Sequence, residues 1–600
     1  MEPQTSDLSS PENTPLDSDN SFYFQTLLLV VIFFVLWINN YLTFYLGYDR
    51  AVVKLHDLFY SLFKIDVFNF RLDGSTEKAP YLSSSLLLAS LKNPIILAGL
   101  IFNNVFVCFH YNALRWKNFE SSKQLKYFIF FIALILAWHY STYDYNLYVN
   151  QAHYFDRVFL VFSAGLVLVH PAFTALFVPA LLLVVSQFNY PQGLHSLTSL
   201  YLPCNILLAF IAFMHLIVLT RYTNNKLRTP DGLAVREGGK FLSAVSSVFP
   251  VSLVDRKINW KLFLYITLCI CASFYFAPGL KKIWISPNMY DWPFLNELYM
   301  HTIWKIDAGW LAFLDYPVKQ QVVQWVKLFN TPMMLSAAVV EFAAIFILFR
   351  KKLTIFCLLS FCALHLMIFL ESGILFWKWT LLDFAIIVLL ISLPEKPFAD
   401  IFGRKKFVFS IFIIFFSMLY FRPVPLGWWD TKNKFKLQIE AVGESGKHYR
   451  IQESLMSPYH LLFSYQRYDF IVDEKLLYPS GSTSSFKRFM EVRNTGKEGL
   501  PDLKEKFGEN HYNEEKADEL DKFLKVFFQN LNERMDKKTI FSYLAAPHHV
   551  YFDDLFNKPM GSYQLQEKLA VIKIRFVENY YENGKVILIQ EKIVRSIPIL

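Results

Sequence analysis

The chain has 600 residues, of which 54% are hydrophobic, 18% aromatic and 18% charged, and its mean hydropathy is +0.29. Its apolar residues fall into blocks long enough to cross a bilayer, which excludes an ordinary soluble domain and predicts a polytopic membrane protein. The net charge of +9 comes from basic residues gathered in particular loops, so we expect a lipid bilayer as partner and no nucleic acid. All 6 cysteines lie in apolar blocks, and none lies in the soluble tail to form a disulfide framework there.

The chain begins with an acidic segment, residues 1–20, whose Ser, Pro, Asp and Asn content predicts a disordered tail. The apolar block at about 22–46 is too long for the core of a signal peptide and predicts a retained anchor. Residues 21–422 are therefore expected to form a multi-pass α-helical domain with about nine to eleven spans. After the first block, the expected spans lie at about 94–113, 125–140, 156–170, 171–188, 198–221, 262–280, 332–350, 353–371, 375–394 and 406–422.

Basic loops predict the orientation of these spans. Clusters of Lys and Arg lie around residues 115–126, 221–240, 350–352 and 404–406. If all four face the cytoplasm, the N-terminus is cytoplasmic and the C-terminal residues are extracytoplasmic. We therefore expect a multi-pass protein of the bacterial inner membrane or the endoplasmic reticulum.

Residues 423–600 have a different pattern and predict a mixed α/β, β-rich extracytoplasmic domain. The alternation at 434–439 is typical of a strand, and the apolar spacing at 514–537 is typical of an amphipathic helix. Near the end, two apolar runs at 570–577 and 586–594 flank an Asn583-Gly584 pair, which predicts a β-hairpin.

Lys281 and Lys282 form the most informative polar pair, because they end a long apolar helix on the predicted external side. One interpretation is an anchor, in which both ammonium groups reach lipid headgroups at the helix C-terminus. The other is a base, because a lysine at the margin of a low-dielectric region can lose its proton near neutral pH.

Other polar residues lie in or beside the predicted spans, namely His153, Glu341, His365 and Asp383. A carboxylate in hydrocarbon normally faces a partner or a cavity, whereas a buried histidine is often a packing hydrogen bonder. Because several of these groups fall in the middle or external half of a helix, we expect a common cavity that opens outward.

A second cluster, His548-His549 followed by Asp553-Asp554, has nitrogen and oxygen ligands for a metal ion. No further ligands are clustered with it, so the sequence favours a solvated loop and predicts no metal site.

Four short motifs together resemble vitamin K-dependent gamma-glutamyl carboxylases and their relatives with the HTTM (horizontally transferred transmembrane) domain. Gly-Leu-Lys-Lys-Ile at 279–283, followed by Trp292, is similar to the family's Gly-Val-Lys-Lys-Leu segment and tryptophan. Asn-Gln-Ala-His-Tyr at 150–154 is similar to its Asn-Asn-His-Ser-Tyr helix start. The His365 region, 364–376, resembles its later histidine helix, and Glu341 matches the acidic residue of the preceding span. The resemblance covers roughly residues 120–420.

The resemblance implies a membrane enzyme that couples hydroquinone epoxidation by O2 to removal of a carbon-bound proton and to CO2 addition to glutamate. Reduced vitamin K or another quinone would be the cofactor, and a glutamate-containing peptide or protein would be the partner. Lys282 would be the base, with Lys281 as a neighbouring cation, and His153 would stabilise the developing oxyanion. His365, Glu341 and Trp292 would support the quinone or substrate pocket.

The sequence departs from the family at three points. Pro278 stands where the family usually has alanine, a loop after the first histidine is missing, and no cysteine pair ties the two domains together. Glutamate is therefore one candidate substrate among others. A non-catalytic HTTM protein that acts in binding or transport through its external domain is the alternative.

Overall fold

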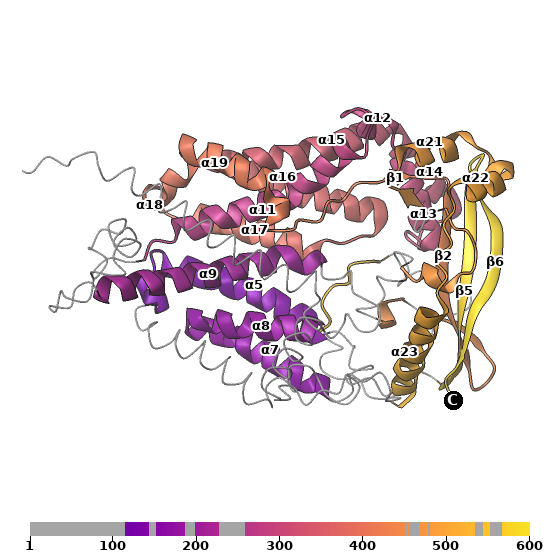
Figure 1. Ribbon diagram of the computed structural model, residues 1–600, viewed down its shortest axis with the longest axis horizontal. Coiled ribbons are helices and arrows are strands. Elements are labelled where there is room, and N and C mark those ends of the chain that lie inside the picture. The colour runs from indigo at the N-terminus through magenta and orange to yellow at the C-terminus, as the bar shows by residue number, and fades with distance from the viewer. Residues whose placement is uncertain are drawn as a thin grey trace, which may run out of the picture.

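The computed structural model describes residues 114–142, 152–186, 198–226, 258–451, 453–456, 463, 467–477, 481–533, 544–551 and 567–600. This part is mostly helical and has a small β region near its C-terminal end (Figure 1). The predicted tail at 1–20, the first anchor and the span at 94–113 lie outside the described residues.

The described helices of the bundle follow the predicted apolar blocks. Four of them, or segments within them, are long and apolar enough to cross a membrane: Ser122–Thr142, Tyr201–Val218, Lys261–Trp284 and Lys351–Ser372. A fifth candidate is the pair Tyr316–Leu328 and Asn330–Phe346, which is bent by 60°. The bundle helices are α5 (Ser122–Thr142), α7 (Ala152–Val169), α8 (Thr174–Ser186), α9 (Thr198–Lys226), α11 (Lys261–Trp284), α15 (Asn330–Ala343), α16 (Lys351–Ser372), α17 (Trp377–Ser392) and α19 (Arg404–Phe415).

A tight turn at His170 and Pro171 joins the two short helices α7 and α8. His170 leaves the helix in an extended conformation, and its Nδ1 accepts a hydrogen bond from the backbone N–H of Ala172 at 3.2 Å. Pro171 follows at the first position of a 3-10 turn, where its missing N–H costs nothing. The chain therefore reverses within a few residues.

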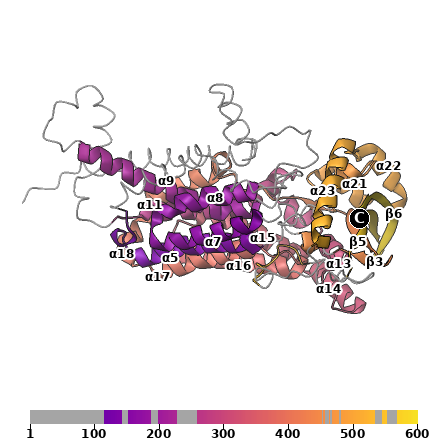
Figure 2. The ribbon, with the colours of Figure 1, turned by 90° about the horizontal axis from the view of Figure 1, so that it is seen from below.

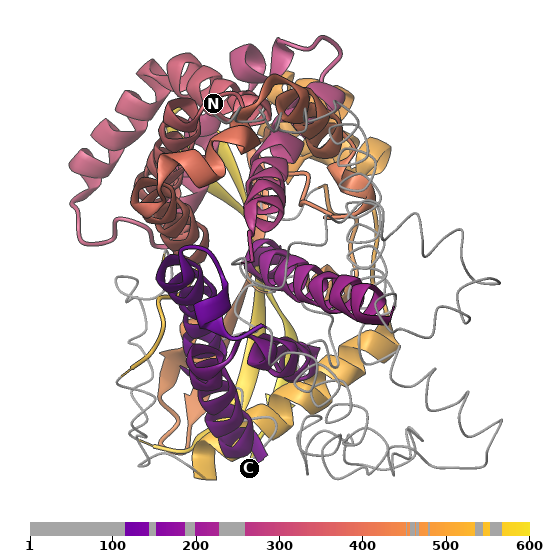
Figure 3. The same cartoon turned by 90° about the vertical axis from the view of Figure 1, so that its left-hand side faces the viewer.

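Helix α11 occupies the middle of the bundle. Every side chain from Phe263 to Gly279 is buried, as expected for a helix that is apolar on all sides. It packs against α9 on one side and against α15 and α19 on the other. Seen end-on, the indigo and purple helices α5–α9 lie on one side of the bundle and the salmon helices of 330–415 on the other (Figure 3). Polar groups on α11 therefore contact other protein segments.

Short helices lead from α11 to the β region. They are α12 (Asp291–Leu295), α13 (Leu298–Ala308) and α14 (Tyr316–Leu328). The indole of Trp304 on α13 donates to the carbonyl of Thr431 at 2.7 Å, and the Lys434 ammonium donates to the Trp304 carbonyl at 3.0 Å. These bonds hold the β region against the end of the bundle.

The main sheet has four antiparallel strands in the order β3-β2-β5-β6. The strands are β2 (Asn433–Gly443), β3 (His448–Arg450), β5 (Leu569–Glu582) and β6 (Lys585–Pro598). Helix α23 (Glu514–Glu533) lies beside this sheet (Figure 2), and its buried side chains belong to the same core as Ile572, Ile574 and Phe576 of β5. The predicted strand at 434–439 and the amphipathic helix are thus confirmed.

The predicted C-terminal hairpin is also confirmed. Glu582 pairs with Lys585, which leaves Asn583 and Gly584 as a two-residue loop. Their φ angles of 50° and 78° are both positive, as a type I′ turn requires. The other strands and α-helices of the described residues are a two-stranded sheet of β1 (Trp429–Asp430) and β4 (Ser482–Thr483), and helices α18 (Glu395–Phe398), α21 (Phe486–Asn494) and α22 (Leu500–Phe507).

Candidate functional site

One face of α11 holds three polar side chains along its length, Cys271, Tyr275 and Lys282. Spacings of four and seven residues place side chains nearly above one another on a helix. This face meets α15, α16 and α17, each of which contributes an acidic or imidazole partner. The polar groups therefore form two layers, one at Lys282 and one about two turns deeper at Tyr275.

The first layer is a buried ion pair between Lys282 and Glu341 of α15. The lysine residue is 8% exposed and the glutamate 7%, and the ammonium contacts both carboxylate oxygens. The ring of Trp292 covers the ammonium, whose nitrogen lies 4.7 Å from the ring centroid. Removing two charges from water is costly, so the pair depends on this close contact between its partners.

Two glycines let the backbone approach this pair closely. A Cβ atom on Gly279 would lie 3.1 Å from the Cβ of Glu341, and one on Gly427 would lie 3.0 Å from the Cγ of Lys281. The indole N–H of Trp292 donates to the carbonyl of Trp428 at 2.8 Å. The segment that leads to β1 therefore lies directly over the end of α11, and Lys281 packs against it rather than joining the ion pair.

The second layer joins α11 to α16 and α17. The Tyr275 hydroxyl donates to the Asp383 carboxylate and lies 2.8 Å from Nε2 of His365. Cys271 donates to the same carboxylate at 3.3 Å. Because the hydroxyl hydrogen goes to Asp383, Nε2 of His365 must donate, which leaves Nδ1 as an acceptor. This Nδ1 is buried, and no partner for it lies in the described part of the chain.

A third polar cluster lies where α13, α16 and β1 meet. Glu371 accepts from Thr302 at 2.7 Å and lies 3.1 Å from Nδ1 of His301. Asp430, 1% exposed, accepts from Asn296 at 2.9 Å. Burial raises the pKa of Asp430 to about 6, although nearby His301 acts in the opposite direction. The cluster thus contains a carboxyl group that changes charge in mildly acidic solution.

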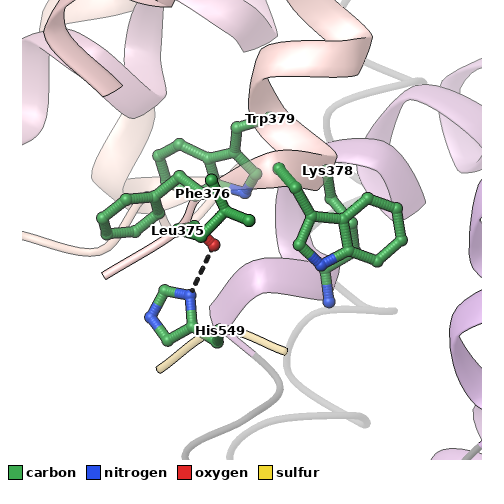
Figure 4. Close-up of a pocket in the computed structure, with 6 residues that line it drawn as sticks. Leu375, Phe376, Lys378, Trp379 and His549 are labelled. Carbon is green, nitrogen blue, oxygen red and sulfur yellow. Dashed lines mark hydrogen bonds between the residues drawn. The ribbon is translucent and has the colours of Figure 1, made fainter. Parts of the chain in front are cut away.

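A cavity lies at the start of α17, under the segment 544–551. Figure 4 shows His549 facing Leu375 and Phe376, with its Nδ1 3.1 Å from the Leu375 carbonyl oxygen. The backbone N–H of Leu375 in turn donates to the His549 carbonyl at 2.8 Å. Burial lowers the pKa of His549 to about 4. The prediction of a solvated loop at His548-His549 is therefore wrong for His549, because backbone pairing packs it against the bundle.

The predicted site residues are only partly brought together. Lys282, Glu341 and Trp292 are in mutual contact, and His365 lies in the second layer, joined to α11 through Tyr275. His153 lies at the start of α7, but its side chain is outside the described part of the structure. Asp553 and Asp554 are outside the described residues altogether. Among the residues that the structure describes, no group of His, Cys, Asp and Glu could hold a metal ion.

Sequence reasoning missed Cys271, Tyr275, His301 and Asp430. Tyr275 could have been found, because it precedes Lys282 by seven residues and therefore shares its helix face. His301 and Asp430 could not, because their cluster joins segments that are far apart in the sequence.

In the part of the chain that the structure describes, the fold is mostly helical, with four apolar helices of membrane-crossing length, a β region near the C-terminal end and a buried lysine–glutamate pair. No family model, curated protein or solved structure matches the chain.

Proposed function

We propose that the chain is a multi-pass membrane enzyme similar to vitamin K-dependent gamma-glutamyl carboxylases, with Lys282 as the catalytic base. Four apolar helices support the membrane assignment. Helix α16 supports it further, because large apolar side chains on it are exposed. They include Phe356, Leu359, Leu366, Met367 and Leu370. The N-terminus would face the cytoplasm and the β region the opposite side, in the bacterial inner membrane or the endoplasmic reticulum.

The buried Lys282–Glu341 pair is the observation on which the proposed chemistry rests. A base must offer a neutral amine, and a carboxylate next to an ammonium favours the protonated amine. The Lys282–Glu341 pair can itself supply the neutral amine. Transfer of one proton from Lys282 Nζ to a Glu341 oxygen gives a neutral amine and a neutral acid, with no change in total charge.

In this proposal a reduced quinone would bind beside Lys282. Trp292 offers a flat indole face beside the amine, and the amine can accept the proton of a phenolic hydroxyl. A reduced quinone bound there supplies, on oxidation by O2, a base stronger than any side chain. Lys282 would take the hydroxyl proton, and Glu341 would hold the amine in place. A glutamate-containing peptide that loses a carbon-bound proton could then add CO2.

The second layer would hold the deeper end of the bound ring. His365 presents Nδ1 as a buried acceptor without a partner in the described residues, so a hydroxyl group could donate to it. Tyr275 and Asp383 fix the orientation of that imidazole through Nε2. His153 is proposed, from the family resemblance, to donate a hydrogen bond to the developing oxyanion.

Replacement of Lys282 by Ala, with Lys281→Ala as the matched control, tests the proposal. Purified protein in lipid nanodiscs would be given a reduced quinone, and O2 consumption and quinone epoxide would be measured. We expect Lys282→Ala to abolish both and Lys281→Ala to retain most of the activity. Labelled CO2 with a glutamyl peptide would then separate carboxylation from epoxidation alone.

Wild-type protein that consumes no O2 with any reduced quinone would reject the enzyme and leave the non-catalytic membrane protein. Equal loss of activity in the two lysine variants would reject Lys282 as the base.

A further inference from the structure

Helix α14 presents an apolar stripe that is left open by the described part of the protein. Val318, Trp325 and Phe329 follow one another at spacings of seven and four residues, which place side chains on one side of a helix. All three are exposed, and the rings of Trp325 and Phe329 stack with their centroids 5.9 Å apart. Leu328 beside them is exposed as well. Exposed apolar side chains that are grouped in this way mark an interaction surface.

The other sides of α14 are polar or packed on protein, so the helix is amphipathic. Val326 is buried, and the Lys327 ammonium lies over the ring of Tyr299 on α13, 5.4 Å from its centroid. Gln320 is exposed and lies about 140° around the helix from Trp325. The helix contains two lysines and no acidic residue, so its charge complements the phosphate groups of a lipid surface.

The chain bends by 60° between α14 and α15. Helix α15 continues into the bundle, where it meets α11 at Gly279 and Glu341. Helix α14 turns away from that direction and lies beside the β region, at the lower edge of Figure 2. Leu335 and Val339 on α15 are exposed, so apolar surface runs from α14 along α15 towards α16, which α15 contacts. An amphipathic helix joined to a bundle helix in this way suits the boundary between lipid and water.

A second group of exposed apolar side chains lies at the same end of the bundle. The segment from the end of α11 to α12 exposes Trp284, Met289, Tyr290 and Phe294. The side-chain amide of Asn330, at the start of α15, donates to the carbonyl of Asn296 after α12 at 2.8 Å, so the two segments are adjacent. Tryptophan and tyrosine are enriched where a membrane meets water. We therefore expect the two groups at one level of the membrane.

We infer that α14 lies along the membrane surface on the side of the β region, with Val318, Trp325 and Phe329 among the lipid acyl chains. The inference rests on the membrane assignment of the proposed function and adds the level at which the membrane ends. Lipid is favoured over a protein partner, because the stripe continues the apolar surface of the bundle and the only charges on the helix are lysines. Trp292 of α12 covers Lys282, so this level places the Lys282 layer near the lipid headgroups.

Quenching of a fluorophore on α14 tests the inference. Full-length protein with one added cysteine would be labelled with NBD and placed in phosphatidylcholine–phosphatidylglycerol nanodiscs, with or without bromine near the headgroup end of the acyl chains. The described cysteines are buried or half-buried, and the emission of identically treated wild type would be subtracted. Trp325→Cys and Val318→Cys report on the stripe, and Gln320→Cys is the matched control on another side of the same helix.

We expect brominated lipid to remove most of the emission at positions 325 and 318 and little at 320, where aqueous iodide should quench instead. Leu366→Cys, at an exposed position of α16, reports separately on the membrane assignment. Quenching by lipid at 366 but by iodide at 325 and 318 would overturn the inference and leave the proposed membrane enzyme intact. Quenching by iodide at all four positions would reject the membrane assignment itself. Quenching by neither agent at 325 and 318 would show that protein covers the stripe, which would also overturn the inference.

Discussion

Gly279 and Glu341 lie so close together that a methyl group at position 279 would sit 3.1 Å from the Cβ of the glutamate. Gly279→Ala should therefore push α15 away from α11 and weaken the Lys282–Glu341 contact. Overpacking of this kind costs about 1–3 kcal/mol, which denaturant titration in micelles would measure as a loss of unfolding free energy. The proposed quinone-dependent activity should fall with it.

Gly165→Ala is the matched control, because a Cβ at position 165 meets no atom within 4 Å. This helical substitution should leave activity intact and stabilise by about 0.5–1 kcal/mol. Equal effects of the two substitutions would contradict the close contact.

A double-mutant cycle tests the buried pair itself. Lys282→Met or Glu341→Gln leaves an uncompensated polar partner in a buried site, and the loss of one member of such a pair costs about 3–5 kcal/mol. The double variant should recover much of this loss, since no lone charge is left. The exposed Lys475–Glu505 pair, at 46% and 79% side-chain exposure, is the control, and Lys475→Ala should cost less than about 1 kcal/mol. Additive effects at 282 and 341 would show that the residues do not interact.

Two titratable groups outside the candidate membrane-crossing helices, Asp430 and His549, should give opposing acid responses. The pKa of Asp430 is raised to about 6 in the folded state, whereas an aspartate in the unfolded chain has a pKa of about 4. Between these two pH values the folded state therefore binds a proton that the unfolded state does not. The contribution of Asp430 to stability increases as pH falls from about 6 to 4. The pKa of His549 is lowered to about 4, so its contribution decreases as pH falls from about 6.5 to 4. In the wild type the two trends partly cancel.

Single variants should separate these trends. Asp430→Asn should make stability fall more steeply with acid between pH 6 and 4, and His549→Gln should make it fall less. Each slope should change by up to about 1.4 kcal/mol per pH unit, the value for one proton. Unfolding curves at several pH values would measure the slopes, and an unchanged slope in either variant would contradict the assigned shift.

The type I′ turn of the C-terminal hairpin gives a local prediction. Gly584 has a φ of 78°, a conformation that a Cβ disfavours by about 1–2 kcal/mol. Gly584→Ala should lower the unfolding free energy of the β region by that amount. Because the neighbouring space is open, with no atom within 4 Å, a clash cannot explain the loss. A Gly584→Asn variant should lose less, since asparagine tolerates positive φ.

Local patterns allowed much of the fold to be predicted. The apolar blocks predicted the bundle helices, and Asn583-Gly584 predicted the hairpin, because helix periodicity and turn chemistry act over a few residues. We expected Lys282, Glu341 and Trp292 to line the same pocket, but the sequence did not predict that they contact one another. The Lys282–Glu341 ion pair depends on how α11 and α15 cross, which the sequence pattern does not specify.

Other features depend on contacts between distant segments. Lys378 lies at the start of the apolar helix α17, yet it is only 5% exposed and lines the same cavity as His549 of the distant segment 544–551. His549 was predicted to lie in a solvated loop because no further ligands cluster with it in the sequence, whereas an antiparallel bridge between Ile374 and Val550 holds it against the bundle. Burial of this kind follows from tertiary pairing and has no local signature.

The order of the main sheet has a consequence for biosynthesis. Strand β2 leaves the bundle at Asn433, but its long partner β5 begins only at Leu569. At the ~5–20 residues per second of translation, β2 waits roughly 6–25 s for that partner. During this interval Phe435, Leu437 and Ile439 and one strand edge are open to other chains. Yield should therefore depend on a chaperone in the compartment that receives β2, and on how fast the segment between the two strands is translated.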